Sequence, residues 1–339
     1  MHGRKAFIGI VGAAVLALLT GCGGGIGGDV PADRSPHRNA FAVVNGVRLH
    51  YLDWGGWGET LLFLPGLGDN AHIFDDLAPR FTNGYRVLAL TRRGFGQSDQ
   101  PADGYDVDTL ATDVKGLLDA LGIERVHLVG HSIAGNELTR FAARYPERVG
   151  KLVYLDAALD RSDNTPVDVP DPYSGEIIPP PEPTPADFAS FAAALAFSKR
   201  NSDAWSDAKE NNLRDVVVVQ ADGSVLPRTT GTVLEPFFAA SVQYQAEYAK
   251  VQAPALALYA LPGDIFDVYP FLPRDVSGKT RELAERDVLA GQAYRRAQAA
   301  RFGREVARGR VVEMQDTVHY LFIQRPDEVF REIEAFLRD

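Results

Sequence analysis

The chain has 339 residues, of which 45% are hydrophobic and 24% are charged, and its formal net charge is -10. This balance is ordinary for a globular protein, and an α/β domain of this length can be single. The acidic charge disfavours a nucleic-acid partner, since neutralising phosphates needs a basic face and no basic stripe is present. The only cysteine excludes an intramolecular disulfide and a cysteine-rich metal site.

Residues 1–21 have the pattern of a signal peptide. Arg4 and Lys5 give a positive start, and the apolar run from Ala6 to Leu19 is too short for a comfortable transmembrane span. The sequence LTGC, which ends at Cys22, resembles the lipobox of bacterial lipoproteins. This resemblance implies export, cleavage before Cys22, and a lipid on Cys22 that anchors the protein to a membrane of the cell envelope. An ordinary secretory signal with an incidental cysteine is the alternative.

Residues 22–39 are rich in glycine and proline and predict a flexible tether, so the folded domain is expected over residues 40–339. The apolar runs and alternations typical of strands are Val47 to Trp54, Thr60 to Leu64, Tyr85 to Leu90, Val126 to Val129, Lys151 to Leu155, Ala255 to Tyr259 and Arg310 to Glu313. Helical patterns between them are Ala71 to Phe81, Val107 to Leu121, Asn136 to Arg144, Arg281 to Ala307 and Pro326 to Leu337. This alternation predicts an α/β fold with a mostly parallel sheet covered by helices on both faces.

The segment at about 160–252 breaks this alternation. It begins with a proline run that excludes regular structure (Pro166, Pro170, Pro172, Pro179, Pro180, Pro181, Pro183 and Pro185). Helix-like pieces follow at Ala186 to Phe197 and Leu234 to Tyr248. We interpret the segment as an inserted lid over the carboxyl ends of the strands, with a separate second domain as the alternative.

The strand candidate Val126 to Val129 leads into a possible nucleophile elbow. It breaks at Gly130, Ser132 follows two residues later, and Ala134 and Gly135 open a helical run. The pattern G-x-S-x-small in a strand–turn–helix context is typical of a catalytic serine, because only small residues let the two backbones approach. Alone, the pattern could be a chance Gly-x-Ser in a loop, so its surroundings must decide.

A serine nucleophile needs a histidine base and an acid that orients it, in the chain order Ser, Asp or Glu, His for one large fold family. Of the seven histidines, only His319 follows the last strand and precedes the last helix. The others lie before the elbow, inside strands or beside the nucleophile (His2, His37, His50, His72, His127 and His131). His319 is therefore the predicted base.

The acid has three candidate positions. Asp264 lies just past the Ala255 to Tyr259 strand, where the chain order asks for it, and is our preferred acid. Asp267 follows three residues later, and Asp156 and Asp160 follow the preceding strand.

The oxyanion of an acyl-transfer intermediate needs two preorganised N–H donors. Ile133, directly after the nucleophile, should supply one. The loop Pro65 to Asp69, which follows the Thr60 to Leu64 strand, should supply the other through Leu67. A phosphate-binding loop is the rival interpretation, but the required lysine and spacing are missing.

These segments, in this order, resemble the α/β-hydrolase superfamily in its lid-bearing branch of esterases, lipases, epoxide hydrolases and related enzymes. The matching pieces are FLPGLGD, TRRGFGQSDQP, LVGHSIAGNEL, the Asp264 loop and DTVHYLF. Pro65 stands where the family often has histidine, and Thr91 where it often has aspartate. A serine at position 132 argues against the epoxide hydrolases and haloalkane dehalogenases, which use an aspartate nucleophile.

We expect a serine hydrolase that cleaves an ester of a small to medium apolar group, a small-molecule substrate. Aromatic residues in the predicted lid motivate the apolar substrate (Phe188, Phe191, Phe197, Trp205, Phe237 and Phe238), although they could equally pack the lid onto the sheet. Lactone, thioester, peptide or C–C cleavage stays open, since a fold does not fix a substrate, and a non-catalytic binding protein is the second class. The sequence implies no metal, organic cofactor or obligate protein partner.

Overall fold

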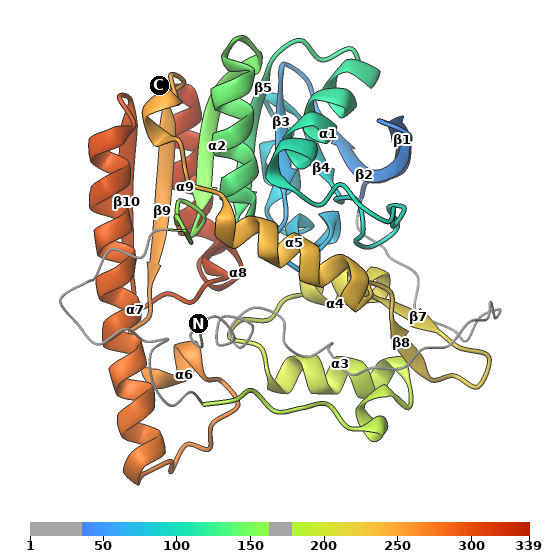
Figure 1. Ribbon diagram of the computed structural model, residues 1–339, viewed down its shortest axis with the longest axis vertical. Helices are drawn as coiled ribbons and strands as arrows, with labels where there is room; N and C mark the ends of the chain where they lie inside the picture. Colours follow the sequence, from blue (N-terminus) through green and yellow to red (C-terminus); the bar gives the residue numbers. More distant parts are fainter. Residues whose placement is uncertain (1–35, 163–177) are drawn as a thin grey trace.

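A central eight-stranded sheet organises the protein, whose computed structural model describes residues 36–162 and 178–339 (Figure 1). In spatial order the strands are β1 (Arg38–Val44), β2 (Val47–Gly55), β4 (Tyr85–Leu90), β3 (Glu59–Leu64), β5 (Val126–His131), β6 (Val149–Leu155), β9 (Ala255–Leu261) and β10 (Gly309–Gln315). The pairs β1–β2 and β2–β4 are antiparallel, and all other pairs in this sheet are parallel. The parallel strands therefore end at one common edge.

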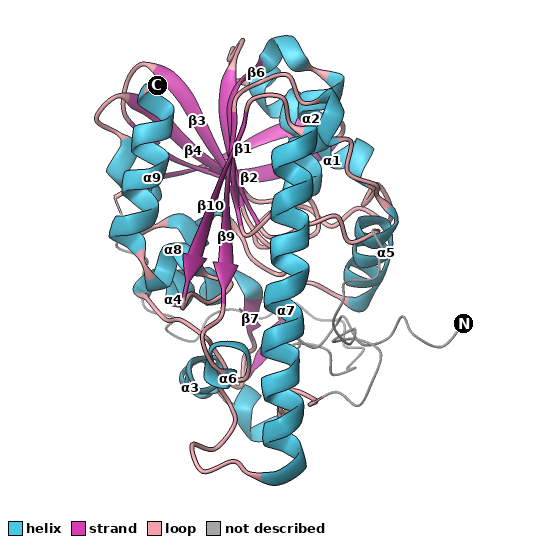
Figure 2. Cartoon of the chain, turned by 90° about the vertical axis from the view of Figure 1, so that its left-hand side faces the viewer, coloured by secondary structure: helices cyan, strands magenta, loops and turns pink. Residues whose placement is uncertain are grey.

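Helices cover both faces of the sheet, as expected for parallel strands that are apolar throughout. Every residue of β5 and of β9 is buried. One face packs against α1 (Val107–Ala120), α2 (Ala134–Arg144) and α7 (Gly278–Glu305). The other packs against α8 (Leu321–Gln324), α9 (Pro326–Arg338) and the 3₁₀ helices η3 (Ala71–Phe74) and η4 (Ala78–Phe81). Figure 2 shows α9 and α7 on opposite sides of the sheet.

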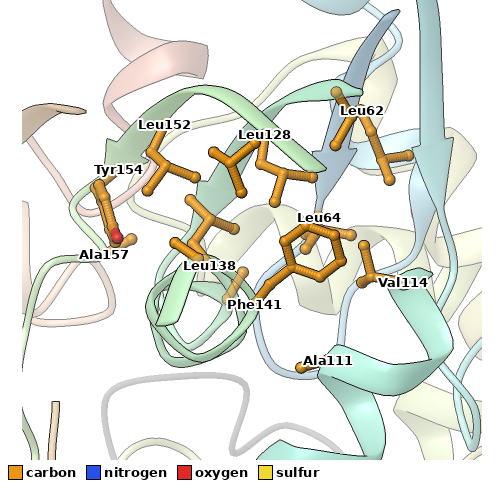
Figure 3. Packing of buried hydrophobic residues seen from close by; sticks show 14 of the residues in the cluster. Leu62, Leu64, Ala111, Val114, Leu128, Leu138, Phe141, Leu152, Tyr154 and Ala157 are labelled. Atoms are coloured by element: carbon orange, nitrogen blue, oxygen red, sulfur yellow. The ribbon is translucent and has the colours of Figure 1, made fainter. Parts of the chain in front are cut away.

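The core under α1 and α2 shows how this packing is made (Figure 3). Leu62, Leu128 and Leu152 come from adjacent strands and are fully buried. Phe141 of α2 and Val114 of α1 belong to the same apolar cluster. Burying such side chains stabilises the fold by about 1.5–3 kcal/mol each, and the packed layer fixes the end of β5 beside α2.

The sequence-based elements are largely confirmed. Each predicted strand is present, and its ends lie within two residues of the predicted ones. The helix predicted over Ala71 to Phe81 is wrong, because the segment forms two short 3₁₀ helices and Pro79 lies in the first turn of the second. The sequence interpretation also missed β1, which begins at Arg38 inside the expected tether.

The segment between β6 and β9 lies across the carboxyl ends of the parallel strands (Figures 1 and 2). Its described part contains η6 (Pro185–Phe188), α3 (Phe191–Arg200), α4 (Asp207–Val216), a small β7–β8 hairpin (Val217–Val219 and Val225–Pro227), α5 (Gly231–Gln243) and η7 (Tyr248–Lys250). It is joined to the sheet layer by polar contacts: Asn70 N–H donates to Asn212 Oδ1 (2.8 Å), and Asn136 Nδ2 donates to the Ser241 carbonyl (3.0 Å).

Several predictions fall outside the described residues. These are the signal peptide, the lipidated Cys22, most of the tether, and the first prolines of the inserted segment. Among the helices that are described, none combines the length and apolar character needed to cross a membrane.

Candidate active site

Ser132 lies at a sharp turn between β5 and α2, as the elbow pattern predicted. Its φ is +55°, a left-handed conformation that is uncommon and strained for a non-glycine residue. Its N–H donates to the Leu155 carbonyl at the end of the neighbouring β6 (3.1 Å). The turn therefore holds the serine at the carboxyl edge of the sheet, where an elbow nucleophile is expected.

Small residues give the elbow its clearance. A methyl group on Gly130 would lie 2.7 Å from the Leu138 side chain, and one on Gly135 would lie 1.8 Å from the Ala157 carbonyl oxygen. The second contact is with backbone that cannot move aside easily. The start of α2 thus packs directly on the turn that follows β6.

His319 is oriented by Asp156, not by Asp264. The distance from His319 Nδ1 to Asp156 Oδ2 is 2.6 Å, and Asp156 is fully buried. Asp156 directly follows β6 and has a φ of +43°, which turns its carboxylate toward the loop after β10. Of the candidate acids from the sequence, Asp156 is therefore the one that contacts the predicted base.

The prediction of Asp264 as the triad acid is wrong, because its carboxylate caps a helix and does not contact His319. Asp264 is exposed and is the N-cap of α6 (Ile265–Val268), where Oδ1 accepts from the Phe266 N–H (2.6 Å). Asp267 completes this capping box by accepting from the Asp264 N–H (3.2 Å), and it also accepts from the Gly263 N–H (2.7 Å). Both carboxylates serve the start of a helix, because an N-cap acceptor satisfies N–H groups that the helix leaves open.

Asp160, the remaining candidate for the triad acid, binds groups other than His319. Its Oδ2 accepts from the Ala246 N–H (3.0 Å) and pairs with Arg301 Nη1 (2.8 Å). It fixes the end of the inserted segment to α7, not the histidine.

Arg295 of α7 is a second partner of Asp156. Its Nη2 lies 3.1 Å from Asp156 Oδ2, and the Ala260 N–H donates to Oδ1 (3.2 Å). Burial alone would raise the pKa of Asp156, but the Arg295 charge and the His319 hydrogen bond outweigh it and lower the pKa. The carboxylate is therefore ionised at neutral pH.

The ring of His319 lies over the elbow. Its centroid is 4.6 Å from that of His131, the residue before Ser132. His319 Nε2 is buried without a hydrogen-bond partner among the described residues, and no hydrogen bond to Ser132 is formed there. Such bonds are often long in free enzymes and tighten with substrate. Burial and the charge of His319 hold the pKa of His131 well below its usual range, so His131 is neutral.

The two residues predicted to supply oxyanion donors, Leu67 and Ile133, pack in one apolar cluster. Ile133 is the N-cap of α2, where the helix dipole favours negative charge. Leu67 packs against the apolar cluster that contains Ile133 and Phe237. Gly68, with a φ of +82°, turns the chain after Leu67. The loop therefore packs beside the elbow, and the role of Leu67 and Ile133 as oxyanion donors stays a prediction.

Arg92 supports the Leu67 loop and was not singled out from the sequence. Its side chain is 1% exposed; it forms an ion pair with Glu137 of α2, and it donates to the carbonyls of Pro65 and Gly66. Burial raises the pKa of Glu137, although the Arg92 charge opposes this. Arg92 stands in the TRRGFG segment, so the motif was a usable signal for it, whereas no sequence pattern marks Arg295.

Asp69 ties three parts of the site together. It is buried, and its carboxylate accepts from Tyr320 Oη (2.9 Å) and from Asn212 Nδ2 of α4 (2.9 Å). Burial raises its pKa. The loop that carries Leu67, the histidine loop and the inserted segment are therefore held by one carboxylate.

Comparison with known proteins agrees with this geometry. A family model described as the alpha/beta hydrolase fold matches residues 59–218. A 2-hydroxy-6-oxononadienedioate/2-hydroxy-6-oxononatrienedioate hydrolase from Paraburkholderia phymatum is 45% identical over 129 residues, which is 37% of this chain and 45% of that protein. A non-heme chloroperoxidase from Streptomyces lividans is 39% identical over 132 residues, 37% of this chain and 48% of that protein. The matches thus span less than half the length of these curated relatives.

Structural similarity extends over most of the chain. The crystal structure of E-2-(acetamidomethylene)succinate hydrolase has a TM-score of 0.64 at 20% identity and covers 89% of this chain and 100% of that one. The strand order, the elbow and these similarities show that the protein has the α/β-hydrolase fold.

Proposed function

We propose that the protein is a serine hydrolase that cleaves a carboxylic ester through an acyl-enzyme on Ser132. The observation that carries this proposal is the buried His319–Asp156 pair, whose free Nε2 lies over a strained serine elbow. An imidazole fixed at Nδ1 by a carboxylate presents Nε2 as a base, the arrangement of a Ser-His-Asp triad.

The reaction would proceed in two halves. Ser132 Oγ attacks the ester carbonyl carbon while its proton passes to His319 Nε2, and the oxyanion accepts from the N–H groups of Leu67 and Ile133. The C–O bond then breaks, and the alcohol leaves with the proton from His319. Water attacks the acyl-enzyme with His319 as base, which releases the acid and restores Ser132. Asp156 stays ionised and stabilises the imidazolium throughout.

The inserted segment supports an apolar substrate of small to medium size, and we propose that it acts as a lid. Phe237 of α5 packs beside Ile133 in a cluster with Phe95, Tyr105 and Leu110. A small pocket at this position is lined by apolar side chains that include Ile133 and Phe237, and by the polar side chains of Asn136, Glu137 and Ser241. By contrast, Phe188 and Phe191 pack against Val217 and Val225 inside the segment itself. Of the predicted lid aromatics, Phe237 is therefore the one next to the elbow that we expect to contact substrate.

A second candidate is cleavage of a C–C bond next to a ketone. The Paraburkholderia phymatum relative, named as an oxononadienedioate hydrolase, favours this reaction, although the similarity covers less than half of that protein. The same serine, histidine and oxyanion donors could serve either bond, because the fold does not fix the substrate.

Activity-based labelling tests the proposal. A fluorophosphonate probe should label the wild-type protein at Ser132 and leave a folded Ser132→Ala variant unlabelled. Turnover of a panel of p-nitrophenyl esters, compared with a 1,3-diketone substrate, then separates ester from C–C cleavage. Absent labelling of the wild type, or equal labelling of both proteins, would exclude Ser132 as the nucleophile. Turnover of neither substrate class above that of Ser132→Ala would favour a binding protein.

We also propose that the domain is exported and anchored to a cell-envelope membrane by lipid on Cys22. The LTGC sequence after an apolar run supports this. Expression in a bacterial host with a radiolabelled fatty acid should label the wild-type chain and not Cys22→Ser. Unchanged labelling of the variant would indicate that the cysteine is incidental.

A further inference from the structure

Two histidines and an aspartate meet on the side of the sheet where β1 and β2 form its edge. They are His37, just before β1, His72 in η3, and Asp75, just after η3. One side-chain nitrogen or oxygen of each lies within 4.8 Å of the corresponding atoms of the other two. None of the three belongs to the triad or to the oxyanion loop, so the proposed esterase reaction leaves this cluster without a task.

The local fold explains why these donors converge. Asn70 caps η3 by accepting from the His72 N–H (3.0 Å), and the 3₁₀ turn places residues 72 and 75 on one side of the helix. His72 Nδ1 consequently lies 3.0 Å from Asp75 Oδ2. The ring of His37 stands edge-on to the ring of His72, at 5.1 Å between centroids.

The spacing is close to that of a bound metal ion. With metal–nitrogen and metal–oxygen distances of about 2.0–2.2 Å, the ligand atoms of a tetrahedral zinc site lie roughly 3.4 Å apart. The observed distances between the ligand atoms run from 3.0 Å to at most 4.8 Å. The most distant pair would therefore need to approach by little more than 1 Å when an ion binds. His37 is only half-buried and precedes the first strand, so it can make that movement.

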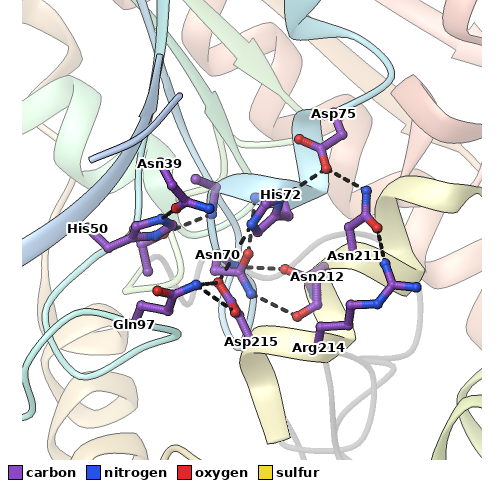
Figure 4. Close-up of polar contacts among 12 residues, drawn as sticks. Asn39, His50, Asn70, His72, Asp75, Gln97, Asn211, Asn212, Arg214 and Asp215 are labelled. Carbon is purple, nitrogen blue, oxygen red and sulfur yellow. Dashed lines mark hydrogen bonds and ion pairs between the residues drawn. The ribbon is translucent and has the colours of Figure 1, made fainter. Parts of the chain in front are cut away.

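A second layer of polar groups surrounds the cluster (Figure 4). Asn211 Nδ2 of α4 donates to Asp75 Oδ2 (2.8 Å). On the far side of the His72 ring, Asp215 Oδ2 lies 3.7 Å from Nε2, and Gln97 holds this carboxylate by donating to both of its oxygens (2.9 Å each). A carboxylate behind a ligating imidazole is the usual support of a metal-bound histidine.

The net charge and the donor types indicate which ion would bind. Two imidazole nitrogens and one carboxylate oxygen suit a borderline ion such as Zn²⁺, and suit Mg²⁺ or Ca²⁺ poorly. Asp75 and Asp215 provide two negative charges near the site. The neighbouring His50 is engaged elsewhere, with Nδ1 2.9 Å from Thr91 Oγ1.

We propose that His37, His72 and Asp75 form a binding site for a divalent transition-metal ion, with Zn²⁺ as the ion of best fit. His72 would bind through Nδ1, with Nε2 directed toward Asp215. The sequence implied no metal, because His37 is far from His72 and Asp75 in the chain and the three residues lack a recognisable ligand spacing. Bound metal would fasten the start of the domain to η3, which also contacts α4 through Asn211.

Metal titration of the purified protein tests the site. After dialysis against a chelator, the wild-type protein should take up one equivalent of Zn²⁺, measured by competition with a chromophoric chelator and by elemental analysis. Co²⁺ should give the intense visible absorption of a four- or five-coordinate ion. His37→Ala and Asp75→Asn should each weaken Zn²⁺ binding at least tenfold. Zn²⁺ should raise the melting temperature of the wild type and not that of these two variants.

Matched variants separate this site from other histidines. His127→Gln removes a histidine near Glu59, and His319→Gln removes the triad base; both should bind Zn²⁺ as the wild type does. His37→Ala changes a half-buried residue, and circular dichroism should show an unaltered fold even if Asp75→Asn is unstable. Absence of a bound equivalent in the wild type, affinity unchanged in His37→Ala, or affinity lost in His319→Gln would each overturn the proposal.

Discussion

Strands β6 and β9 are parallel neighbours that end at the same edge of the sheet, and each is followed by an aspartate with a different task. Asp156, after β6, is fully buried between His319 and Arg295. Asp264, after β9, is exposed and caps a four-residue helix. The position after a strand therefore does not by itself make an acid catalytic. An aspartate in this position can orient the histidine only if the loop that carries His319 and the helix α7 lie next to it.

The largest difference between the two aspartates should appear in catalysis. Asp156→Asn should lower kcat by about 10⁴-fold, because an amide no longer holds the imidazole in the reactive tautomer or stabilises the imidazolium. Asp264→Asn should change kcat by less than about twofold, since its carboxylate does not contact His319. Steady-state hydrolysis of the best p-nitrophenyl ester measures both. The reverse order of effects would return the triad to the β9 turn.

The two turns should also differ in how they tolerate a methyl group. In Gly135→Ala the new carbon would lie 1.8 Å from the Ala157 carbonyl oxygen, next to Asp156, so the backbone of the β6 turn must move. We expect a loss of about 3 kcal/mol or more in the free energy of unfolding. In Gly263→Ala, at the β9 turn, the new carbon would lie 2.3 Å from the end of the Asp316 side chain. Because that side chain can rotate away, the free energy of unfolding should fall by about 1 kcal/mol or less. Urea denaturation compares them, and equal losses would contradict this view of the elbow.

The β6 turn also differs from the β9 turn because its aspartate, Asp156, forms an ion pair with Arg295. Because Arg295 and His319 lower the pKa of Asp156 below its unfolded value of about 3.9, the wild type gains stability above that pH and loses it as the pH falls toward the folded pKa. In Arg295→Gln burial dominates and the pKa of Asp156 rises, so this gain is lost.

The free energy of unfolding of Arg295→Gln should therefore be lower than that of the wild type by roughly 2–3 kcal/mol at pH 7, and the gap should shrink below about pH 4. Urea denaturation from pH 3 to pH 7 follows it. Arg295→Lys, which keeps the positive charge, should recover part of the loss. A gap that is constant with pH would mean that Arg295 acts through packing alone.

The sequence predicted what local pattern determines. Strand periodicity located the sheet, and Gly130, Ser132 and Gly135 located the elbow, because a strained turn needs small residues in a fixed order. His319 could be found by elimination and by its place after the last strand. These features depend on a few consecutive residues, and the structure has them where the sequence indicated.

The acid, Arg295 and the proposed metal site depend on contacts between residues that are far apart in the chain. Asp156 and His319 are 163 residues apart, and Arg295 and Asp156 are 139 apart. Two aspartates after neighbouring strands are indistinguishable in sequence until the φ of one and the position of α7 are known. The chain order favoured Asp264, and the folded environment favours Asp156. Likewise, the sequence predicted that His37 belongs to a tether, whereas in the structure it directly precedes β1 and contacts His72 of η3.

The smallest effect should come from the helix cap at the β9 turn. Asp264→Ala removes the acceptor that binds the Phe266 N–H (2.6 Å), and N-cap losses of this kind cost about 1 kcal/mol. Asp264→Ser keeps a cap acceptor and should be nearly as stable as the wild type. Both variants should retain wild-type kcat, because α6 packs against α7 through Ile265 and the Asp264 carboxylate caps α6, whereas Asp156 orients His319. If Asp264→Ser restored stability while both variants lost activity, the β9 turn would have a catalytic task that capping does not explain.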